Sequence, residues 1–351
     1  MKKMLSFALA LSMMMLLLAG CGDKAAEPTE PTEVTPDAPV ETRVIQLGHI
    51  DSEVDVDPYN LLATYFAQNL SELSGGAFEI DIIGDAQLGA ETAMVEGMKM
   101  QTVDAAIISN FSYSGFVSGF ATFDMPYLFE NKDQAHAVMD SEEILGELKQ
   151  KLYDEYDVKL LSYGDGGFRS VISTVKTVED PADLTGLKIR VPGNETYLDA
   201  FKAFGAAPVT MSSSECIAGL QQGTVDAMEQ PIVPMYTYGS YEICSYICLT
   251  EHIFNPISLT VSKSLWESLT EEEQGWFQQA ATEAAKQQRA DLDQIEVETL
   301  DKMVTERGIK VNEISDKTAF REAAAAAYEK YYAAQGHDLM DKVDAVIESV
   351  G

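Results

Sequence analysis

The sequence predicts an α/β protein of two lobes with a cleft between them. Two runs of alternating strand and helix patterns support this fold class, the first over residues 43–108 and the second over residues 158–228. A long, mostly polar helical pattern then starts at residue 270, and such a helix is expected to lie along both lobes rather than inside one. The chain of 351 residues is long enough to build two hydrophobic cores.

The first run has the pattern β-α-β-α-β. Residues 43–50 and 78–82 alternate as strands, and residues 103–108 form a continuous apolar run typical of a buried parallel strand. Helices are predicted between them, one over residues 59–73, where apolar side chains recur every three or four positions, and a short one over about 90–100. This is the opening of a parallel sheet with right-handed crossovers.

The second run repeats the pattern without sequence similarity to the first. Strands are predicted at residues 158–161, 168–174, 187–191 and 225–228, helices at 197–204 and 213–221, and a strand that crosses between the lobes at 254–261. Residues 164–167, with the sequence GDGG, lack the Gly-Lys-Ser/Thr ending of a phosphate loop and are expected to relax the backbone at a crossing point.

The C-terminal part is predicted to be helical. Thr270 and Glu273 have the spacing of a capping box, and Gly308 is suited to end a helix that runs to about residue 306. Two further helices are expected over residues 318–334 and 337–350. We expect one lobe to hold residues 43–165 and about 254–294, and the other to hold residues 166–253 and about 295–351.

The N-terminus has the pattern of a secretory signal. Lys2 and Lys3 precede an uncharged apolar stretch, residues 4–20, which is at the lower limit for a transmembrane anchor and is not followed by clustered positive charge. Residues 18–21, LAGC, resemble the bacterial lipobox, in which the cysteine is acylated. We therefore expect a signal peptide over residues 1–20, acylation of Cys21, and a Pro/Thr/Glu-rich tether up to residue 42. The predicted location is extracytoplasmic, on a lipid anchor in the bacterial cell membrane.

The composition excludes several classes of protein. The 24 Lys and Arg residues face 57 Asp and Glu residues, a formal charge of −33, which argues against nucleic acid and against electrostatic docking on anionic lipid. A hydrophobic content of 46% excludes a disordered acidic chain. Four cysteines are too few for a disulfide scaffold, and Cys216, Cys244 and Cys248 are expected to be buried thiols or, for the last two, a disulfide.

Signals of catalysis and of cofactors are absent from the sequence. The four histidines are scattered, and no His-Glu-x-x-His, Cys-x-x-Cys or Gly-x-Ser-x-Gly motif occurs. We therefore expect no enzyme activity, no metal site and no cofactor. A tethered, two-lobed α/β protein of this kind is typical of solute-binding proteins, which close around a ligand in the cleft.

Arg190 is the first candidate for binding such a ligand. It lies at the end of an apolar strand, shortly before Pro192, and strand carboxyl ends face the ligand crevice in open α/β sheets. Its guanidinium can grip a carboxylate through two parallel hydrogen bonds. Position alone leaves two hypotheses open, a ligand contact and a structural ion pair.

Four segments together resemble the substrate-binding subunits of TRAP (tripartite ATP-independent periplasmic) transporters, of the DctP type. They are 84–91 (GDAQLGAE), 123–129 (FDMPYLF), 166–169 (GGFR) and 183–192 (DLTGLKIRVP), which continues through 201–206 (FKAFGA). The resemblance covers the chain from about residue 43 to the C-terminus. It implies a periplasmic-binding-protein-like fold, an organic acid as ligand, and small and large integral membrane subunits as partners.

The resemblance also implies roles for three residues. Arg190 falls on the main carboxylate clamp of the family, and Arg169 on its second basic contact, for which a salt bridge within the lobes is the rival hypothesis. The family often has Gln-Glu-Asn-Pro where this chain has Met228-Glu229-Gln230-Pro231. Gln230 keeps the amide of the family's Asn one methylene further out, and Met228 suggests a less polar ligand, so simple C4-dicarboxylate specificity is in doubt.

Six further residues are candidates for the ligand-binding site. Glu91 opens a helix, where it orders backbone or pairs with an arginine, and Ser109 and Asn110 follow the third strand. Tyr197 begins the helix after Arg190, His49 ends the first strand, and Phe254 lies in the crossing segment, where packing is the rival role.

The sequence thus predicts a receptor that binds an organic acid and delivers it to TRAP membrane subunits. A ligand-sensing lipoprotein of a signalling system and a receptor of an ABC-type importer remain alternatives.

Overall fold

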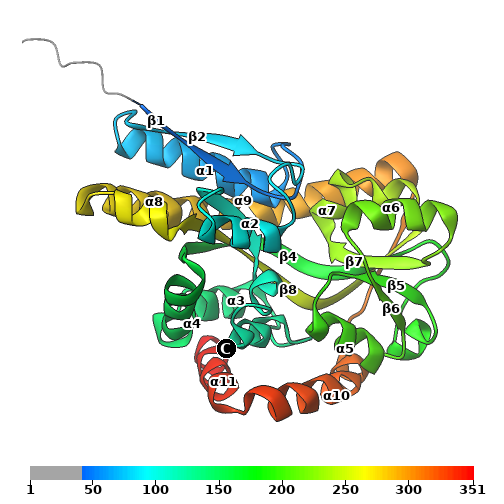
Figure 1. Cartoon of the computed structure of the whole chain (residues 1–351). Coiled ribbons are helices and arrows are strands. Elements are labelled where there is room, and N and C mark those ends of the chain that lie inside the picture. The colour runs from blue at the N-terminus through cyan, green and yellow to red at the C-terminus, as the bar shows by residue number, and fades with distance from the viewer. Residues whose placement is uncertain (1–41) are drawn as a thin grey trace, which may run out of the picture. The chain divides into compact units, whose positions relative to one another are not determined.

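A computed structural model of the protein describes residues 42–351, which form one compact unit around a single mixed sheet (Figure 1). The predicted signal peptide, Cys21 and the tether therefore lie outside the described residues. The strands are β1 (Arg43–Gly48), β2 (Phe78–Ile83), β3 (Ala105–Ser109), β4 (Val158–Ser173), β5 (Lys188–Val191), β6 (Ala207–Thr210), β7 (Ala227–Pro231), β8 (Tyr246–Ser262) and β9 (Lys310–Glu313).

The strand order confirms the predicted two-lobed α/β fold. The order is β2-β1-β3-β8-β4-β7-β5-β6, with β9 paired to β8. In the first lobe β1 lies parallel to β2 and β3, and in the second β5 lies parallel to β6 and β7. Strands β4 and β8 are antiparallel to one another and run through both lobes. Consequently the carboxyl ends of β1, β3, β5 and β7 carry residues toward the region between the lobes.

Both crossing strands are longer than predicted. The sequence indicated separate strands at 158–161 and 168–174, but β4 is continuous over Val158–Ser173 and pairs with β8 along its length. The GDGG segment makes this possible, since the register of the two strands shifts between Asp165 and Phe168, and Gly167 has a φ of 89°. The prediction that this segment relaxes the backbone is confirmed, whereas the prediction of two strands was wrong.

Eleven α-helices are found among the described residues. They are α1 (Pro58–Leu73), α2 (Glu91–Lys99), α3 (Lys132–Met139), α4 (Glu142–Tyr156), α5 (Glu195–Ala203), α6 (Ser213–Gln222), α7 (Ile232–Thr237), α8 (Lys263–Ser268), α9 (Glu271–Arg307), α10 (Thr318–Gln335) and α11 (Asp338–Val350). Two 3₁₀ segments used below are η1 (Asn110–Tyr113) and η2 (Ser118–Asp124). Helices α3, α4, α7 and α8 and strands β6 and β9 were not predicted. Within residues 42–351, no helix is both long and apolar enough to cross a membrane.

Helix α9 spans both lobes, as predicted (Figure 1). It begins at the capping box, in which the Thr270 backbone N–H donates to Glu273 Oε2 at 2.7 Å, and it ends at Gly308 in the left-handed conformation. Phe277 near its start packs in the core under β1, while Met303 near its end packs in a cluster of the second lobe.

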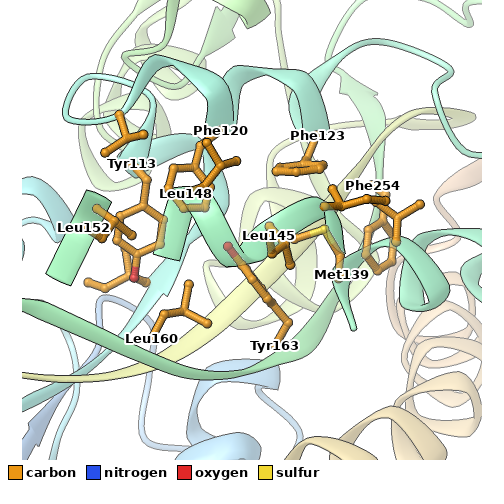
Figure 2. Packing of buried hydrophobic residues seen from close by; sticks show 14 of the residues in the cluster. Tyr113, Phe120, Phe123, Met139, Leu145, Leu148, Leu152, Leu160, Tyr163 and Phe254 are labelled. Atoms are coloured by element: carbon orange, nitrogen blue, oxygen red, sulfur yellow. The ribbon is translucent and has the colours of Figure 1, made fainter. Parts of the chain in front are cut away.

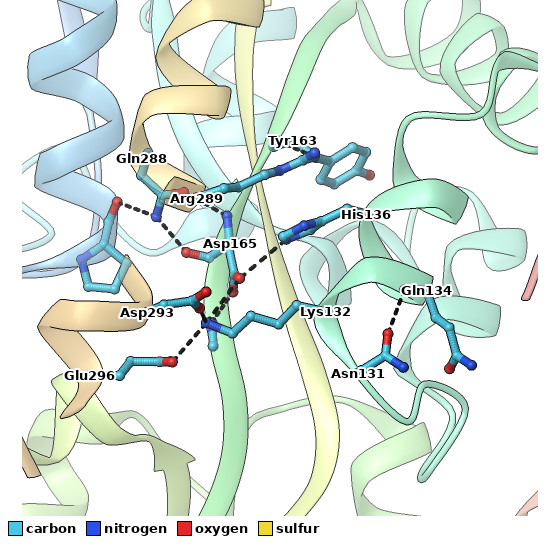
Figure 3. Close-up of polar contacts among 12 residues, drawn as sticks. Asn131, Lys132, Gln134, His136, Tyr163, Asp165, Gln288, Arg289, Asp293 and Glu296 are labelled. Atoms are coloured by element: carbon cyan, nitrogen blue, oxygen red, sulfur yellow. Dashed lines mark hydrogen bonds and ion pairs between the residues drawn. The ribbon is translucent and has the colours of Figure 1, made fainter. Parts of the chain in front are cut away.

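A buried polar network ties α9 and α3 to the crossing point of β4 (Figure 3). The Asp165 backbone N–H donates to Gln288 Oε1 at 2.9 Å, and Gln288 Nε2 donates to the Asp165 backbone oxygen at 2.6 Å. The Lys132 ammonium lies 3.3 Å from the Asp165 carboxylate. Burial works against the charge of Asp165, but His136 and Lys132 hold its pKa below the ordinary value. The bend in β4 is therefore braced by charged groups from two helices.

Aromatic side chains fill the core of the first lobe between β4, β8 and the helices on one face of the sheet (Figure 2). Phe254 packs edge-on against Phe129 and Phe168, with ring centroids 6.1 and 5.2 Å apart. The cysteines Cys216, Cys244 and Cys248 are buried free thiols, so of the two predicted alternatives the structure has the thiols.

Candidate functional site

A cavity of about 1040 Å³ lies where strand ends of the two lobes meet. Its walls include residues that follow β1, β2 and β3 in the first lobe and residues of β5 and β7 and the segments after them in the second. Polar and charged side chains on these walls include Asp51, Tyr59, Asp85, Glu91, Ser109, Arg169, Arg190, Asn194, Gln230 and Tyr238. Of the nine predicted binding residues, five line this cavity: Arg190, Arg169, Gln230, Glu91 and Ser109.

Arg190 presents a buried charge to the cavity without a carboxylate partner. It lies near the end of β5 and is only 5% exposed. Its Nε donates to the backbone oxygen of Met211 at 2.8 Å, and among the described residues no acid forms an ion pair with it. Burial lowers the pKa of its guanidinium, but arginine stays protonated at neutral pH. The two terminal nitrogens are therefore available to an anion in the cavity.

Arg169 lines the same cavity but is held by an acid of its own. Its Nε and Nη2 donate to the two carboxylate oxygens of Glu229 at 2.6 and 2.8 Å, and Nη2 also donates to the Glu229 backbone oxygen at 3.0 Å. Burial works against the charge, yet Glu229 raises the pKa of Arg169 above the ordinary value. The guanidinium carbon lies 5.2 Å from the centre of the Tyr197 ring, a cation–π contact. The rival salt bridge exists, therefore, and it orients the arginine.

His252 extends this network within the second lobe. Its ring lies 3.2 Å from Glu229 Oε2 through Nε2 and 2.8 Å from Thr250 Oγ1 through Nδ1. Burial lowers the pKa of His252, so a neutral ring that donates through Nε2 fits both contacts. The sequence showed no sign of this contact, because Glu229 and His252 lie on different strands and meet only through β4.

Gln230 lines the cavity with an amide that Ser240 holds in place. Ser240 donates its hydroxyl proton to the Met235 backbone oxygen at 3.1 Å, so it accepts a hydrogen bond from Gln230 Nε2 at 2.9 Å. This fixes the amide, and its Oε1 is left without a partner although the residue is 2% exposed. The Oδ1 of Asn255, on the cavity wall, is also without a partner. Met228, in contrast, packs in the core near Cys216 and does not line the cavity, so the inference of a less polar ligand from it was wrong.

Glu91 orders the end of β3, one of the two roles predicted for it. Its Oε1 accepts from the Ser109 backbone N–H at 2.7 Å and from the Tyr59 hydroxyl at 3.2 Å, and its Oε2 accepts from the Ser112 hydroxyl at 2.6 Å. Burial raises the pKa of Glu91. The Ser109 and Tyr59 hydroxyls also contact each other, so this wall is a connected set of polar groups.

Asp51 adds a second acidic group to the first-lobe wall. It is 3% exposed, accepts a hydrogen bond from the Tyr238 hydroxyl of the second lobe, and has its pKa raised to about 7 by burial. Asp85 lines the cavity nearby, in a turn where it and Ala86 both adopt the left-handed conformation, with φ of 54° and 55°. Asp51 was not predicted, although it stands two positions after His49 at a strand carboxyl end.

Four predicted residues do not line the cavity. His49 is fully buried, and neither ring nitrogen has a partner within the described residues. Asn110 donates to the Phe120 backbone oxygen and to Asp124, and Tyr197 lies against Arg169. Phe254 belongs to the core, as its rival role predicted. Residues 42–351 contain no cluster of His, Cys, Asp or Glu side chains that could hold a metal ion.

Two α/β lobes around a cavity that contains a buried, unpaired arginine define a solute-binding protein of the two-lobed class. Residues 49–335 match the DctP family, described as "Bacterial extracellular solute-binding protein, family 7". The chain belongs to this family.

Named relatives agree with the family and the fold. The 2,3-diketo-L-gulonate-binding periplasmic protein of Escherichia coli K12 is 30% identical over 86% of this chain and 92% of its own. A TRAP periplasmic solute-binding protein of Polaromonas with bound D-erythronate superposes with a TM-score of 0.81 at 27% identity, over 88% of this chain and 98% of its own. A sugar acid-binding protein of Advenella mimigardefordensis in complex with galactonate gives 0.82 at 26%, over 89% and 100%. The predicted resemblance is confirmed, and these proteins are receptors rather than enzymes.

Proposed function

We propose that this protein is the solute receptor of a TRAP-type transporter and that it binds an organic acid in the cavity between its lobes. The observation that supports this most strongly is Arg190, a guanidinium that is 5% exposed and lacks a carboxylate partner among the described residues. An unpaired charge is costly to bury, whereas a charge that meets an oppositely charged ligand is stabilised. A ligand carboxylate would supply two parallel hydrogen bonds to Nη1 and Nη2.

We further propose that the acid carries hydroxyl groups and a single carboxylate. The cavity walls include Asp51 and Asp85 as well as the unpartnered acceptor oxygens of Gln230 and Asn255. Hydroxyl groups can donate to all of these, while a second carboxylate would meet acceptors and negative charge. Relatives that bind D-erythronate, galactonate and L-gulonate support this choice of a sugar acid over a C4-dicarboxylate.

Closure of the cleft follows from the two-lobed arrangement. We assign residues 43–165 and about 254–294 to one lobe and residues 166–253 and about 295–351 to the other. An acid that contacts both lobes binds the closed form more strongly and so shifts the population toward it. Closure also removes water from around Arg190, which strengthens its attraction to the carboxylate.

Delivery of the acid requires partners outside this chain. We propose that Cys21 is acylated and that residues 22–42 tether the receptor to the bacterial cell membrane. The closed receptor then docks on the small and large integral membrane subunits of a TRAP transporter, which couple uptake to an ion gradient. The matched family, whose members are extracellular or periplasmic solute-binding proteins, supports the location.

A melting-shift screen tests the proposed ligand class. D-galactonate, D-glucuronate and D-erythronate are compared with succinate and with neutral D-galactose. A ligand at one hundred times its Kd adds about 2.7 kcal/mol of stability, which raises the Tm of a chain of this length by roughly 4 °C. A rise in Tm only with D-galactose would refute the carboxylate clamp. A rise only with succinate would refute the proposal that the cavity walls bind hydroxyl groups of the acid.

A further inference from the structure

Two of the polar contacts that join the lobes come from Asn194 and Tyr238 on the cavity wall. The first is made by Asn194, which follows β5 and caps helix α5. Its Nδ2 donates to the Phe111 backbone oxygen and to the Ser114 hydroxyl, both at 2.9 Å. Phe111 and Ser114 belong to the segment that follows β3, in the first lobe. Asn194 is 5% exposed, so this contact is well shielded from water.

The two ends of the Asn194 amide have separate tasks. Its Oδ1 accepts from the Thr196 backbone N–H at 2.8 Å, which caps helix α5 inside the second lobe. The Nδ2 is not needed for the cap and is used entirely for the first lobe. Because the cap requires only an acceptor, serine can keep the cap while it removes the interlobe donor.

The second contact is made by Tyr238, which follows α7 in the second lobe. Its hydroxyl donates to the Asp51 carboxylate, which follows β1 in the first lobe, and lies 3.5 Å from the Ile50 backbone oxygen. Asp51 is 3% exposed. The neighbouring Thr237 hydroxyl lies 3.4 Å from Asp57 Oδ2, so residues 237 and 238 both meet the first lobe here.

Both contacts break when the lobes separate, because each joins a donor of one lobe to an acceptor of the other. We propose that Asn194 and Tyr238 are interlobe latches that hold the cleft closed and thereby set how long the acid stays bound. This inference rests on the proposed function. A latch adds to the stability of the closed state, so its loss raises the rate of opening and of release, while the rate of encounter with the acid is unchanged.

The expected effect is modest and measurable. Loss of one neutral hydrogen bond corresponds to about fivefold in an equilibrium or rate, and two independent losses multiply to roughly 25-fold. Asn194→Ser loses two such bonds, and Tyr238→Phe loses one bond to a carboxylate, which is stronger than a neutral one, so each variant should change the rate by about fivefold or more. The variants are Asn194→Ser and Tyr238→Phe, and the matched controls are Asn131→Ser and Tyr241→Phe. Asn131 caps α3, and Tyr241 donates to Glu306 within the second lobe at 3.0 Å, so neither control lines the ligand cavity or donates a hydrogen bond to the other lobe.

Stopped-flow dissociation of D-galactonate from the full chain tests the latches. Each latch variant should release the acid at least about fivefold faster, with the association rate and the Tm of the free protein unchanged, and the controls should match wild type. Release rates equal to wild type would overturn the proposal. A fall in the Tm of the free protein that parallels the faster release would also overturn it, because the role would then be structural.

Direct contact of Asn194 with the acid is the rival explanation, since Asn194 lines the cavity. A double-mutant cycle with Ser114→Ala separates the two. If Asn194 latches onto Ser114, the double variant releases the acid no faster than the Asn194→Ser variant, whereas multiplied effects overturn the latch. Failure of wild type to bind any acid of the screen would refute the proposed function, and this outcome precedes any comparison of variants.

Discussion

Replacing Arg190 by alanine should abolish sugar-acid binding and leave the fold intact. Three cations line the cavity within residues 42–351: Arg169 is paired with Glu229, Lys330 is paired with Asp199, and only Arg190 forms no ion pair with an acid. Among the residues that the structure describes, its single hydrogen bond is that of Nε to the Met211 oxygen. The variant therefore loses much more in binding than in folding.

The magnitude follows from the number of hydrogen bonds. A hydrogen bond to a charged group contributes about 1.5–3 kcal/mol, so two parallel bonds to a carboxylate contribute about 3–6 kcal/mol. This corresponds to a rise in Kd of roughly 10²- to 10⁴-fold. For folding, loss of the bond to Met211 costs about 1 kcal/mol and is offset by removal of a buried, unpaired charge. The Tm of the free variant should therefore lie within about 2 °C of wild type.

Isothermal titration with D-galactonate measures the loss directly. Arg321→Ala serves as the control, because Arg321 is an exposed arginine that pairs with Glu130 at 2.6 Å, away from the cavity. Arg190→Lys keeps the positive charge but loses the planar guanidinium that can donate two parallel hydrogen bonds. The Kd of this variant should therefore fall between those of wild type and Arg190→Ala. If Arg190→Ala binds D-galactonate within threefold of wild type, the clamp assignment is refuted.

Two further predictions concern the pH dependence of stability and the membrane anchor. Burial raises the pKa of Asp124 to about 8, so the native state retains a proton that the unfolded state releases above about pH 4. Stability should therefore fall between pH 5 and pH 8, and Asp124→Asn should reduce this fall by at least about 1 kcal/mol in urea unfolding. An unchanged slope in the variant would show that Asp124 is ionised in the native state. Cys21→Ala should move the protein from the membrane fraction to the soluble fraction of cells that express it. Continued labelling of that variant by a fatty-acid probe would refute the lipobox.

Local patterns predicted the elements whose signals lie within a few residues. Helix α9 begins and ends as expected because the capping box at Thr270 and the left-handed turn at Gly308 are local interactions. Helices α3 and α4 were missed although Asn131 caps the first and apolar residues recur at helical spacing in the second. The sequence did not indicate that the two halves of β4 form one strand, because a glycine-rich segment such as GDGG weakens a strand pattern. In the folded protein, contacts from α3 and α9 stabilise the bend at this segment.

The binding site shows the same difference between features set by neighbouring residues and features set by residues distant in sequence. Arg190 could be predicted because a strand end and a family motif coincide on it, both of which are properties of contiguous residues. The side chains that pair with the cavity residues could not be predicted from the sequence. Glu229 meets Arg169 from 60 positions away, and Asp51 meets Tyr238 from 187 positions away. Side chains so distant in sequence are brought together by strand order and lobe packing, which depend on the whole core.

The sequence alone therefore established the α/β class, the likeness to a family of acid-binding receptors and the candidate clamp. Folding of the complete chain decided which arginine stays free for a ligand. Of two buried arginines at the same cavity, Glu229 forms an ion pair with Arg169, and none of the described acids forms an ion pair with Arg190. The physical reason is that a charge in a low-dielectric interior is governed by the groups within a few ångströms, and only the packed lobes determine those neighbours.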